Sequence, residues 1–297
     1  MDSKVALITG INGFTGKYVA AELEAAGYAV YGTGIGASDS PRYFQVDLLD
    51  KFGLAKVVSE VQPTVVVHLA AIAFVGHGDV DAFYQVNLIG THNLLEVLTQ
   101  HAGKLTSVLL ASSANVYGNN IEGILCETTP TNPANDYAVS KLAMEYMSKL
   151  WLDKLPLFIV RPFNYTGVGQ TENFLLAKIV AHYNRHAPYI ELGNLDVWRD
   201  FSDVRAVARI YKRLLEVNPK GQTINVCSGK THSLREVLTM VKNISGYEVE
   251  VRINPAFVRA NDVKSLCGDA TRLQSLIGIR DSPSLEDTLR WMLTADA

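Results

Sequence analysis

Short runs of β-branched residues alternate with longer segments of helical periodicity along the first two-thirds of the chain. The run at residues 64–69 is apolar on both faces, as in a strand buried within a parallel sheet. The expected strands are Val5–Thr9, Ala29–Thr33, Thr64–Leu69, Ser107–Ser112 and Leu157–Arg161. The expected helices are Gly16–Ala26, Lys51–Val61, Asp81–His101 and Asn135–Leu152. This alternation predicts an α/β fold with a doubly wound parallel sheet.

After residue 165 the alternation becomes less regular. A helix over Asp203–Glu216 and a strand over Gln222–Cys227 are expected to return to the sheet. The other segments predict a smaller α/β lobe, with helices near Asn173–Arg185 and Ser233–Ile244 and from Ser284, and a strand near Glu248–Ile253. We therefore expect one domain over residues 1–165, to which 203–227 returns, and a lobe over 166–202 and 228–297. A ligand site is expected between them.

Composition and charge exclude several classes of protein. Of the 297 residues, 48% are hydrophobic and 19% are charged, which is typical of a globular enzyme and not of a disordered chain. The net charge of −3 creates no field that would attract nucleic acid or anionic lipid. Neither a signal peptide nor an apolar run of the roughly 20 residues that span a bilayer is found. We expect a cytoplasmic protein with no nucleic-acid or membrane partner.

The spacing of cysteine and histidine indicates no metal site. The three cysteines are odd in number, widely separated and without a Cys-x-x-Cys pair, so no disulfide framework or zinc site is expected. His182 and His186 have the i,i+4 spacing of helical metal ligands, but no Glu or Cys pattern accompanies them. We therefore expect no bound metal.

A glycine-rich turn joins the first expected strand to the first expected helix. Gly10, Gly13 and Gly16 have the spacing G-x-x-G-x-x-G, with Phe14 and Thr15 between the last two glycines. Such glycines permit a tight turn whose backbone N–H groups approach a pyrophosphate at the positive N-terminus of a helix. Between a strand and a helix, the motif predicts a Rossmann-type dinucleotide site.

The segment that would select between NAD(H) and NADP(H) carries no acid. A dinucleotide fold specific for NAD places Asp or Glu about 20 residues after the turn, where it binds the ribose hydroxyls. Here that segment contains Gly34 and Gly36, and Arg42 is the nearest basic residue. Nothing there would repel a 2′-phosphate, so NADP(H) or NAD(H) is the expected cofactor.

Tyr137 and Lys141 have the spacing Tyr-x-x-x-Lys and share one face of the helix expected to begin at Asn135. A cation there, with a positive nicotinamide nearby, is expected to pull the pKa of the phenol below its free value of about 10. Ser113 follows an expected strand, where α/β sheets place their sites. Its hydroxyl is expected to bind a carbonyl oxygen that the tyrosine protonates.

Taken together, the motifs resemble those of the extended short-chain dehydrogenases/reductases that act on nucleotide sugars, of the NAD-dependent epimerase/dehydratase type. The resemblance covers nearly the whole chain, and the motifs occur in family order. They are Gly10–Gly16, Asp47-Leu48, His68–Ala71, Asn87-x-x-Gly90-Thr91, Ser112–Gly118, Tyr137–Lys141 and Arg161–Asn164.

The resemblance assigns roles to individual residues. It implies that Ser113, Tyr137 and Lys141 are the catalytic set, that Tyr137 and Lys141 also contact the cofactor, and that Ser113 also contacts the substrate. The implied cofactor contacts are Gly10, Gly13, Phe14, Thr15, Gly16, Asp47 and Leu48 (at the adenine), and Leu69, Ala70 and Ala71. The implied contacts with the diphosphate of a nucleotide sugar begin with Asn164.

Two later motifs are similar to those of enzymes that make GDP-linked 6-deoxyhexoses. The first is Gly193–Asp200, which implies that Arg199 binds the diphosphate. The second pairs Asn225–Gly229 with Arg259–Val263, as in the GDP-4-keto-6-deoxy-D-mannose reductases, and implies that Arg259 holds the diphosphate and Asp262 a ribose hydroxyl. Arginine suits bidentate phosphate binding and aspartate suits sugar hydroxyls.

The implied activity is NAD(P)H-dependent reduction of the C4 ketone of GDP-4-keto-6-deoxy-D-mannose to GDP-D-rhamnose, for surface-polysaccharide synthesis. One alternative is a reductase of opposite stereochemistry that forms GDP-6-deoxy-D-talose, and another is a nucleotide-sugar epimerase. A third is a non-catalytic NAD(P)-sensing protein, against which the intact set of Ser113, Tyr137 and Lys141 argues.

Two further expectations follow from the resemblance. Dehydratases of the family place an Asp-Glu pair immediately after the catalytic hydroxyl residue, where this chain has Ala114 and Asn115, so we expect no dehydration of the sugar. Members of the family pair helices across a homodimer, and the helix face with Leu142 and Tyr146 is expected to form such an interface.

Overall fold

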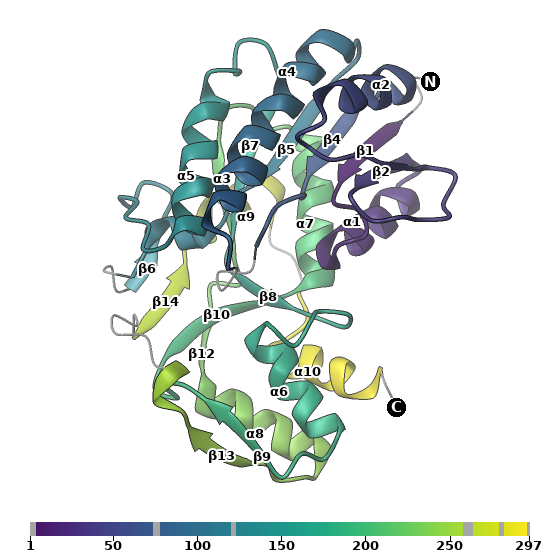
Figure 1. The fold of residues 1–297 in the computed structure, drawn as a ribbon. Coiled ribbons are helices and arrows are strands. Elements are labelled where there is room, and N and C mark those ends of the chain that lie inside the picture. The colour runs from purple at the N-terminus through teal and green to yellow at the C-terminus, as the bar shows by residue number, and fades with distance from the viewer. Residues whose placement is uncertain (1–3, 74–77, 120–122, 258–263, 279–281, 296–297) are drawn as a thin grey trace.

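A parallel sheet of seven strands forms the centre of the larger part of the molecule (Figure 1). The computed structural model describes residues 4–73, 78–119, 123–257, 264–278 and 282–295. The strand order is β11-β7-β5-β4-β1-β2-β3, and all neighbours are parallel. The strands are β1 (Val5–Thr9), β2 (Ala29–Gly34), β3 (Tyr43–Gln45), β4 (Val65–His68), β5 (Ser107–Ala111), β7 (Leu157–Pro162) and β11 (Thr223–Val226). The predicted doubly wound fold is confirmed.

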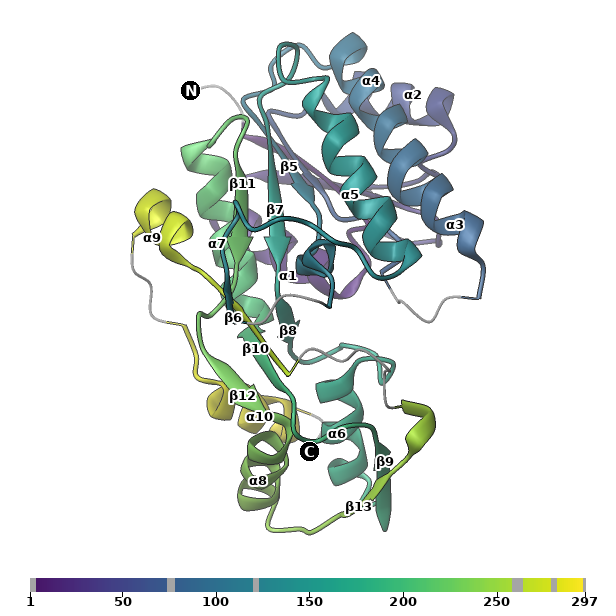
Figure 2. The same cartoon turned by 90° about the vertical axis from the view of Figure 1, so that its left-hand side faces the viewer.

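Helices cover both faces of this sheet, and each face has its own hydrophobic core. Figure 2 shows one layer beside α7 and the other beside α5. The first layer contains α1 (Phe14–Ala25), α7 (Val204–Val217) and α9 (Thr271–Ile277). The second contains α2 (Lys51–Val61), α3 (Val80–Tyr84), α4 (Thr91–His101) and α5 (Asp136–Lys149). All four residues of β4 are buried between the layers, as its continuous apolar run predicts.

The long helix expected over Asp81–His101 is interrupted. A π-helical segment, η1 (Gln85–Gly90), separates α3 from α4. Within it, the Asn87 side chain binds both backbone groups of Ile72 and the Ser140 hydroxyl. The apolar periodicity continues through the segment, so hydrophobic pattern alone could not show a local change that side-chain hydrogen bonds stabilise.

A second sheet forms the lower part of the molecule in Figure 1, with strand order β12-β10-β14-β6 and β8 paired with β10. Its strands are β6 (Gly123–Leu125), β8 (Asn164–Thr166), β10 (Trp198–Asp203), β12 (Thr231–Ser233) and β14 (Ser265–Gly268). A separate pair contains β9 (Tyr189–Leu192) and β13 (Glu250–Ile253). We propose that the lobes divide near residue 165, where β8 follows β7 along the chain and pairs with β10.

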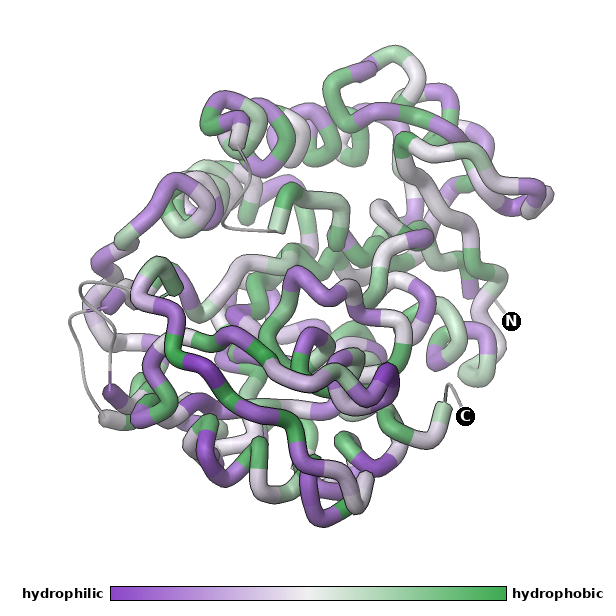
Figure 3. Tube along the Cα trace, turned by 60° about the horizontal axis from the view of Figure 1, so that its bottom comes forward, coloured by the Kyte–Doolittle hydropathy of each residue, from purple (hydrophilic) through white to green (hydrophobic). Residues whose placement is uncertain are grey.

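Three helices of this lobe enclose a third hydrophobic core. They are α6 (Leu175–Asn184), α8 (Leu234–Ser245) and α10 (Leu285–Thr294). Figure 3 shows hydrophobic and hydrophilic residues interspersed along the whole chain. Two 3-10 turns, η2 (Ala114–Tyr117) and η3 (Pro255–Phe257), complete the secondary structure of the described residues. Among those residues, no helix has the length and apolar content needed to cross a bilayer.

Candidate active site

In the glycine-rich turn between β1 and α1, the positions of Gly10 and Gly16 leave no space for a side chain. Gly10 has φ +73°, and a Cβ there would lie 2.9 Å from backbone atoms of Ala70. A Cβ on Gly16 would lie 2.5 Å from the carbonyl oxygen of Gly10. Gly13 is the N-cap of α1 and has no side chain to bind the first N–H groups of the helix. A helix N-terminus left open in this way suits a pyrophosphate.

The other expected cofactor residues lie along the same edge of the sheet. Asp47 is exposed after β3, and its carboxylate accepts a hydrogen bond from the Leu49 N–H at 2.9 Å. Leu48 is buried, and Leu69, Ala70 and Ala71 continue from β4 as half-buried residues. Since ligands of open α/β sheets bind at the carboxyl ends of the strands, these residues fit a nicotinamide dinucleotide.

A buried histidine fixes the end of β4 next to the turn. Thr91 donates its hydroxyl proton to the Asn87 carbonyl, so it accepts from His68 Nε2 at 2.8 Å. His68 Nδ1 then accepts from the Thr9 hydroxyl at 2.7 Å. Burial, with the charge of Lys141, lowers the pKa of His68 to about 3, so the ring is neutral. The residue does not titrate near neutral pH and serves to hold β1, β4 and α4 together.

Ser113, Tyr137 and Lys141 come together at the carboxyl end of β5. Their exposed fractions are only 8%, 7% and 4%. Ser113 follows β5 and lowers the pKa of the neighbouring Tyr137 phenol, while Lys141 Nζ donates to the Ala111 carbonyl at 2.8 Å. The Asn135 side chain caps α5 by accepting from the Ala138 N–H, which places Tyr137 in the first turn of the helix.

Burial controls the protonation of this cluster. It raises the pKa of Tyr137 to about 12, although the hydrogen bond with Ser113 acts in the opposite direction. The expected fall below 10 is therefore wrong for this structure, because burial disfavours the phenolate more strongly than its neighbours favour it. Burial also lowers the pKa of Lys141 to about 8, against the charge of Glu145. At neutral pH the cluster holds a protonated phenol beside an ammonium group.

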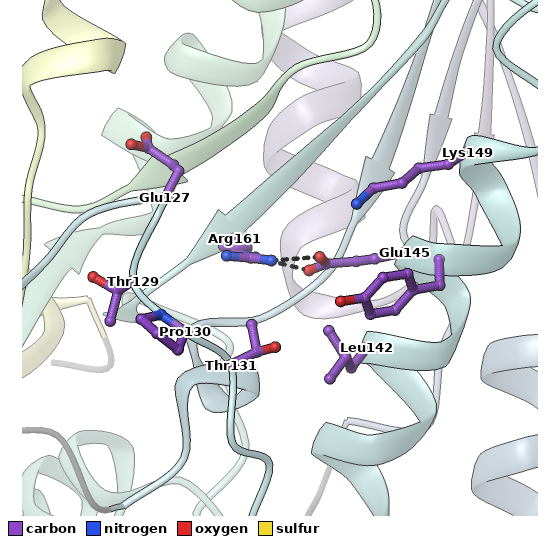
Figure 4. A pocket seen from close by; sticks show the side chains of 9 residues that line it. Glu127, Thr129, Pro130, Thr131, Leu142, Glu145, Lys149 and Arg161 are labelled. Atoms are coloured by element: carbon purple, nitrogen blue, oxygen red, sulfur yellow. Dashed lines mark hydrogen bonds and ion pairs between the residues drawn. The ribbon is translucent and has the colours of Figure 1, made fainter.

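A buried ion pair supports the helix that carries Tyr137 and Lys141 (Figure 4). Arg161, at the end of β7, binds Glu145 through Nε at 2.9 Å and Nη2 at 2.6 Å. Glu145 also accepts a 2.5 Å hydrogen bond from Ser112, the neighbour of Ser113. Sequence reasoning did not assign this pair a role, although Lys141 and Glu145 have i,i+4 spacing. Both residues line a cavity of about 380 Å³ beside α5, and Figure 4 shows their side chains pointing toward each other.

Two of the expected substrate residues, Asn164 and Arg199, lie on neighbouring strands of the second sheet. Asn164 is exposed on β8 and donates to the Asp200 carbonyl at 3.3 Å. Arg199 is half-buried on β10, and its Nη1 donates to the Trp198 carbonyl at 2.9 Å. Arg259 and Asp262 lie outside the described residues. Asp200 follows Arg199 on β10 and binds loops of this lobe through its buried side chain, a role that no pattern in the sequence predicted.

The Asp200 carboxylate is fully buried and accepts hydrogen bonds from the backbone N–H groups of Ser228, Gly229 and Gly268. These bonds tie β10 to the loop before β12 and to the end of β14. Burial nevertheless raises the pKa of Asp200. Metal binding has no support among the described residues, which include no group of three or more His, Cys, Asp or Glu side chains arranged to hold an ion.

Comparisons with known proteins agree with this geometry. The family described as GDP-mannose 4,6 dehydratase matches residues 7–292. GDP-6-deoxy-D-talose 4-dehydrogenase of Aggregatibacter actinomycetemcomitans is 34% identical over 92% of this chain and 90% of its own. GDP-6-deoxy-D-mannose reductase of Pseudomonas aeruginosa is also 34% identical, over 97% of this chain and 95% of its own.

Solved structures share the whole fold. A crystal structure from Burkholderia cenocepacia J2315, described as a candidate epimerase, has a TM-score of 0.93 and 50% identity over 99% of this chain and 98% of its own. RMD from Pseudomonas aeruginosa, complexed with NADPH, has a TM-score of 0.86 and 31% identity over 98% of this chain and 97% of its own. This chain therefore belongs to the GDP-mannose 4,6-dehydratase family of extended short-chain dehydrogenases/reductases, which are nicotinamide-dependent enzymes.

Proposed function

We propose that the protein uses NAD(P)H to reduce the C4 ketone of GDP-4-keto-6-deoxy-D-mannose to GDP-D-rhamnose. The observation that carries this proposal is the buried cluster of Ser113, Tyr137 and Lys141 beside the glycine-rich turn. The 34% identity with a GDP-6-deoxy-D-mannose reductase supports the choice of sugar nucleotide. In this proposal the turn holds the cofactor pyrophosphate, and Asn164, Arg199 and Arg259 hold the GDP diphosphate, with Asp262 at its ribose.

The chemistry follows from the state of the buried phenol. When bound, the reduced nicotinamide supplies a hydride to the carbonyl carbon. Tyr137 donates its proton to the carbonyl oxygen, and a pKa of about 12 keeps that proton on the phenol until the oxygen becomes basic. Ser113 donates a hydrogen bond to the same oxygen, and Lys141 places a positive charge near the developing alkoxide. Tyr137 then recovers a proton from solvent.

The stereochemistry at C4 defines a second candidate. The GDP-6-deoxy-D-talose enzyme is as similar to this chain as the mannose-series reductase, at 34% identity. A hydride delivered to the opposite face of the same ketone would give GDP-6-deoxy-D-talose. Proton NMR of the product formed from NADPH and the purified ketone distinguishes the two. A product identical to GDP-D-rhamnose supports our proposal, and GDP-6-deoxy-D-talose replaces it with the second candidate.

The same assay separates the remaining alternatives. An epimerase would convert a nucleotide sugar without net NADPH oxidation, and a non-catalytic NAD(P) sensor would bind the cofactor without turnover. A dehydratase would act on GDP-mannose directly. Ala114 has no titratable group and the Asn115 amide exchanges no proton near neutral pH, so these positions supply no acid or base for elimination of water. We expect no 4-keto product from GDP-mannose and NAD(P)⁺.

We also propose that the protein is a homodimer in the cytoplasm that pairs α5 with its copy. Large apolar side chains of α5 and the residue after it are exposed, with 60% of Tyr146 and 80% of Leu150 accessible. Sedimentation velocity at micromolar concentration tests this, with Tyr146→Glu as the disrupting variant. A monomer in the unmodified protein would contradict the proposal.

A further inference from the structure

A hydrogen bond joins the glycine-rich turn to the strand that leads into the substrate lobe. The Thr15 hydroxyl lies 2.8 Å from the Tyr165 hydroxyl, across 150 residues of sequence. The ring of Phe14 stacks on the ring of Tyr165, with centroids 6.0 Å apart and an 11° angle between planes. Both contacts come from the first two residues of α1, directly after the N-cap Gly13.

Tyr165 is placed to transmit a change at the turn. It is the central residue of β8, which runs parallel to β10 (Figure 1), and in the register of the two strands it is paired with Ser202. Its neighbour Asn164 donates to the Asp200 carbonyl, and Arg199 precedes Asp200 on β10. A short path of paired backbone therefore connects Thr15 with the two residues that we expect at the GDP diphosphate.

We propose that the Thr15–Tyr165 contact couples the binding of the nicotinamide dinucleotide to the binding of GDP. Tyr165 is a positioning residue in this role. The dinucleotide fixes Thr15 at the N-terminus of α1. Through its hydrogen bond with Thr15, Tyr165 then fixes the position of β8 and of its partner strand β10. Asn164 on β8 and Arg199 on β10 are thereby positioned to bind the diphosphate. This inference rests on the proposed function for the location of the two ligands.

Linkage makes the proposal measurable, because NADPH must change the affinity for GDP by the same factor by which GDP changes the affinity for NADPH. We expect saturating NADPH to tighten GDP binding about fivefold in the unmodified protein, the size of effect that one hydrogen bond supplies. Isothermal titration calorimetry of GDP, with and without NADPH, gives this factor directly.

Three variants test the contact. Tyr165→Phe removes only the hydroxyl and keeps the stacked ring, and Thr15→Val removes the partner hydroxyl at constant shape. Each is expected to reduce the coupling factor to below twofold, and the double variant to reduce it no further. Tyr18→Phe is the matched control, because the Tyr18 hydroxyl also bonds α1 to this segment, through the Val168 carbonyl at 2.7 Å. Its removal keeps the Tyr18 ring against Phe14 and leaves the Thr15–Tyr165 hydrogen bond in place. This variant should retain the full factor.

A merely structural role would lower the unfolding temperature of the two single variants and leave the coupling factor unchanged. That result overturns the proposal, as does a factor of one in the unmodified protein or single effects that multiply in the double variant. Failure of the unmodified protein to bind NADPH or GDP at all would instead overturn the proposed function, and this inference with it.

Discussion

The two regions expected to meet the substrate differ in how firmly their side chains are held. At the end of β5, Ser113, Tyr137 and Lys141 are more than nine-tenths buried and bind one another or fixed backbone. On the second sheet, Asn164 is exposed and Arg199 is half-buried, and both donate to backbone carbonyls of β10. The groups that we propose to be catalytic are therefore organised before substrate binds, whereas Asn164 and Arg199, which we propose to hold the diphosphate, are less buried.

The difference has a physical cause in the elements that carry each region. β5 lies between β4 and β7 near the middle of a sheet covered on both faces, so its end can hold side chains rigidly. β8 and β10 lie at the start of the smaller lobe, where a short strand of three residues presents Asn164. Variants of the first region should therefore change the chemical step, and variants of the second should change substrate affinity.

The largest effect is expected from Tyr137→Phe. The ring remains and only the transferable proton is lost, so kcat should fall about 10²–10⁴-fold while NADPH affinity stays within threefold. Stopped-flow absorbance at 340 nm measures the chemical step, and calorimetry measures cofactor binding. A variant whose kcat is within threefold of the unmodified enzyme would show that another group protonates the ketone.

Glu145→Gln should lower the stability of the protein at α5, the helix that carries Tyr137 and Lys141. It leaves the guanidinium of Arg161 buried without a counter-charge, which typically costs about 3–5 kcal/mol of unfolding free energy. Glu145 also raises the pKa of Lys141, so its loss should move the alkaline fall in kcat/KM from about pH 8 to lower pH. The sign follows because the ammonium form is lost as pH rises through its pKa.

Urea unfolding and a pH–rate profile check these two results. Glu96→Gln is a suitable control, because Glu96 pairs with Lys51 at the surface and should change neither quantity appreciably. If the alkaline fall in kcat/KM stays at the same pH in a folded Glu145→Gln enzyme, Glu145 does not affect the pKa of Lys141. The ion pair with Arg161 would then contribute only to the free energy of unfolding.

Arg199→Lys tests the less firmly held region. Lysine keeps the charge but loses the planar pair of donors that matches a diphosphate, so KM for the GDP-linked ketone should rise about tenfold with kcat nearly unchanged. Arg235→Lys is the control, since Arg235 pairs with Asp196 at the surface of the same lobe. A fall in kcat without a change in KM would place Arg199 with the catalytic groups.

The sequence predicts the first region better than the second, for identifiable reasons. Apart from β3, the strands of the central sheet are largely apolar runs of four to six residues, and Tyr137 and Lys141 form a local pattern within one helix. β10 instead contains Arg199, Asp200 and Asp203 in six residues, and the Asp200 carboxylate is satisfied by backbone N–H groups far away in the sequence. No hydrophobic period marks such a strand. The strands β3, β6, β8, β9, β12 and β14, with three or four residues each, and the seven-residue helix α9 are too short for a hydrophobic period to predict them.

Pairs formed across long sequence separations also escape local patterns. Glu145 and Arg161 lie on different elements, and Tyr165 meets Thr15 across 150 residues. The raised pKa of Tyr137 depends on burial, which spacing along a helix does not report. By contrast, the glycine-rich turn was predictable because its function requires consecutive residues between a strand and a helix.

The smallest expected effect concerns the choice of cofactor, at a site intermediate between the two regions. Gly34 ends β2 without an acid, and a cavity of about 130 Å³ nearby is lined by the donors Asn12, Ser38, Ser40 and Arg42, together with the carboxylate of Glu24. These donors suit a 2′-phosphate, so NADPH should be used at least as well as NADH. The Arg42 guanidinium also lies over the ring of Tyr31 on β2, 5.8 Å from its centroid.

Arg42→Ala should lower kcat/KM for NADPH about three- to tenfold, as expected for a partly exposed ion pair with phosphate, and leave the value for NADH within twofold. Lys17→Ala, on the exposed side of α1, should change neither value. The ratio of kcat/KM for NADPH to kcat/KM for NADH is measured at a fixed concentration of the ketone, with the concentration of each cofactor varied. A preference of the unmodified enzyme for NADH above about tenfold, or 1.4 kcal/mol, would mean that the ribose hydroxyls are bound by a group other than the missing acid. In that case the side chains around Gly34 would be arranged to bind the ribose before the cofactor arrives, as the buried cluster of Ser113, Tyr137 and Lys141 is arranged before substrate binds, although no carboxylate ends β2.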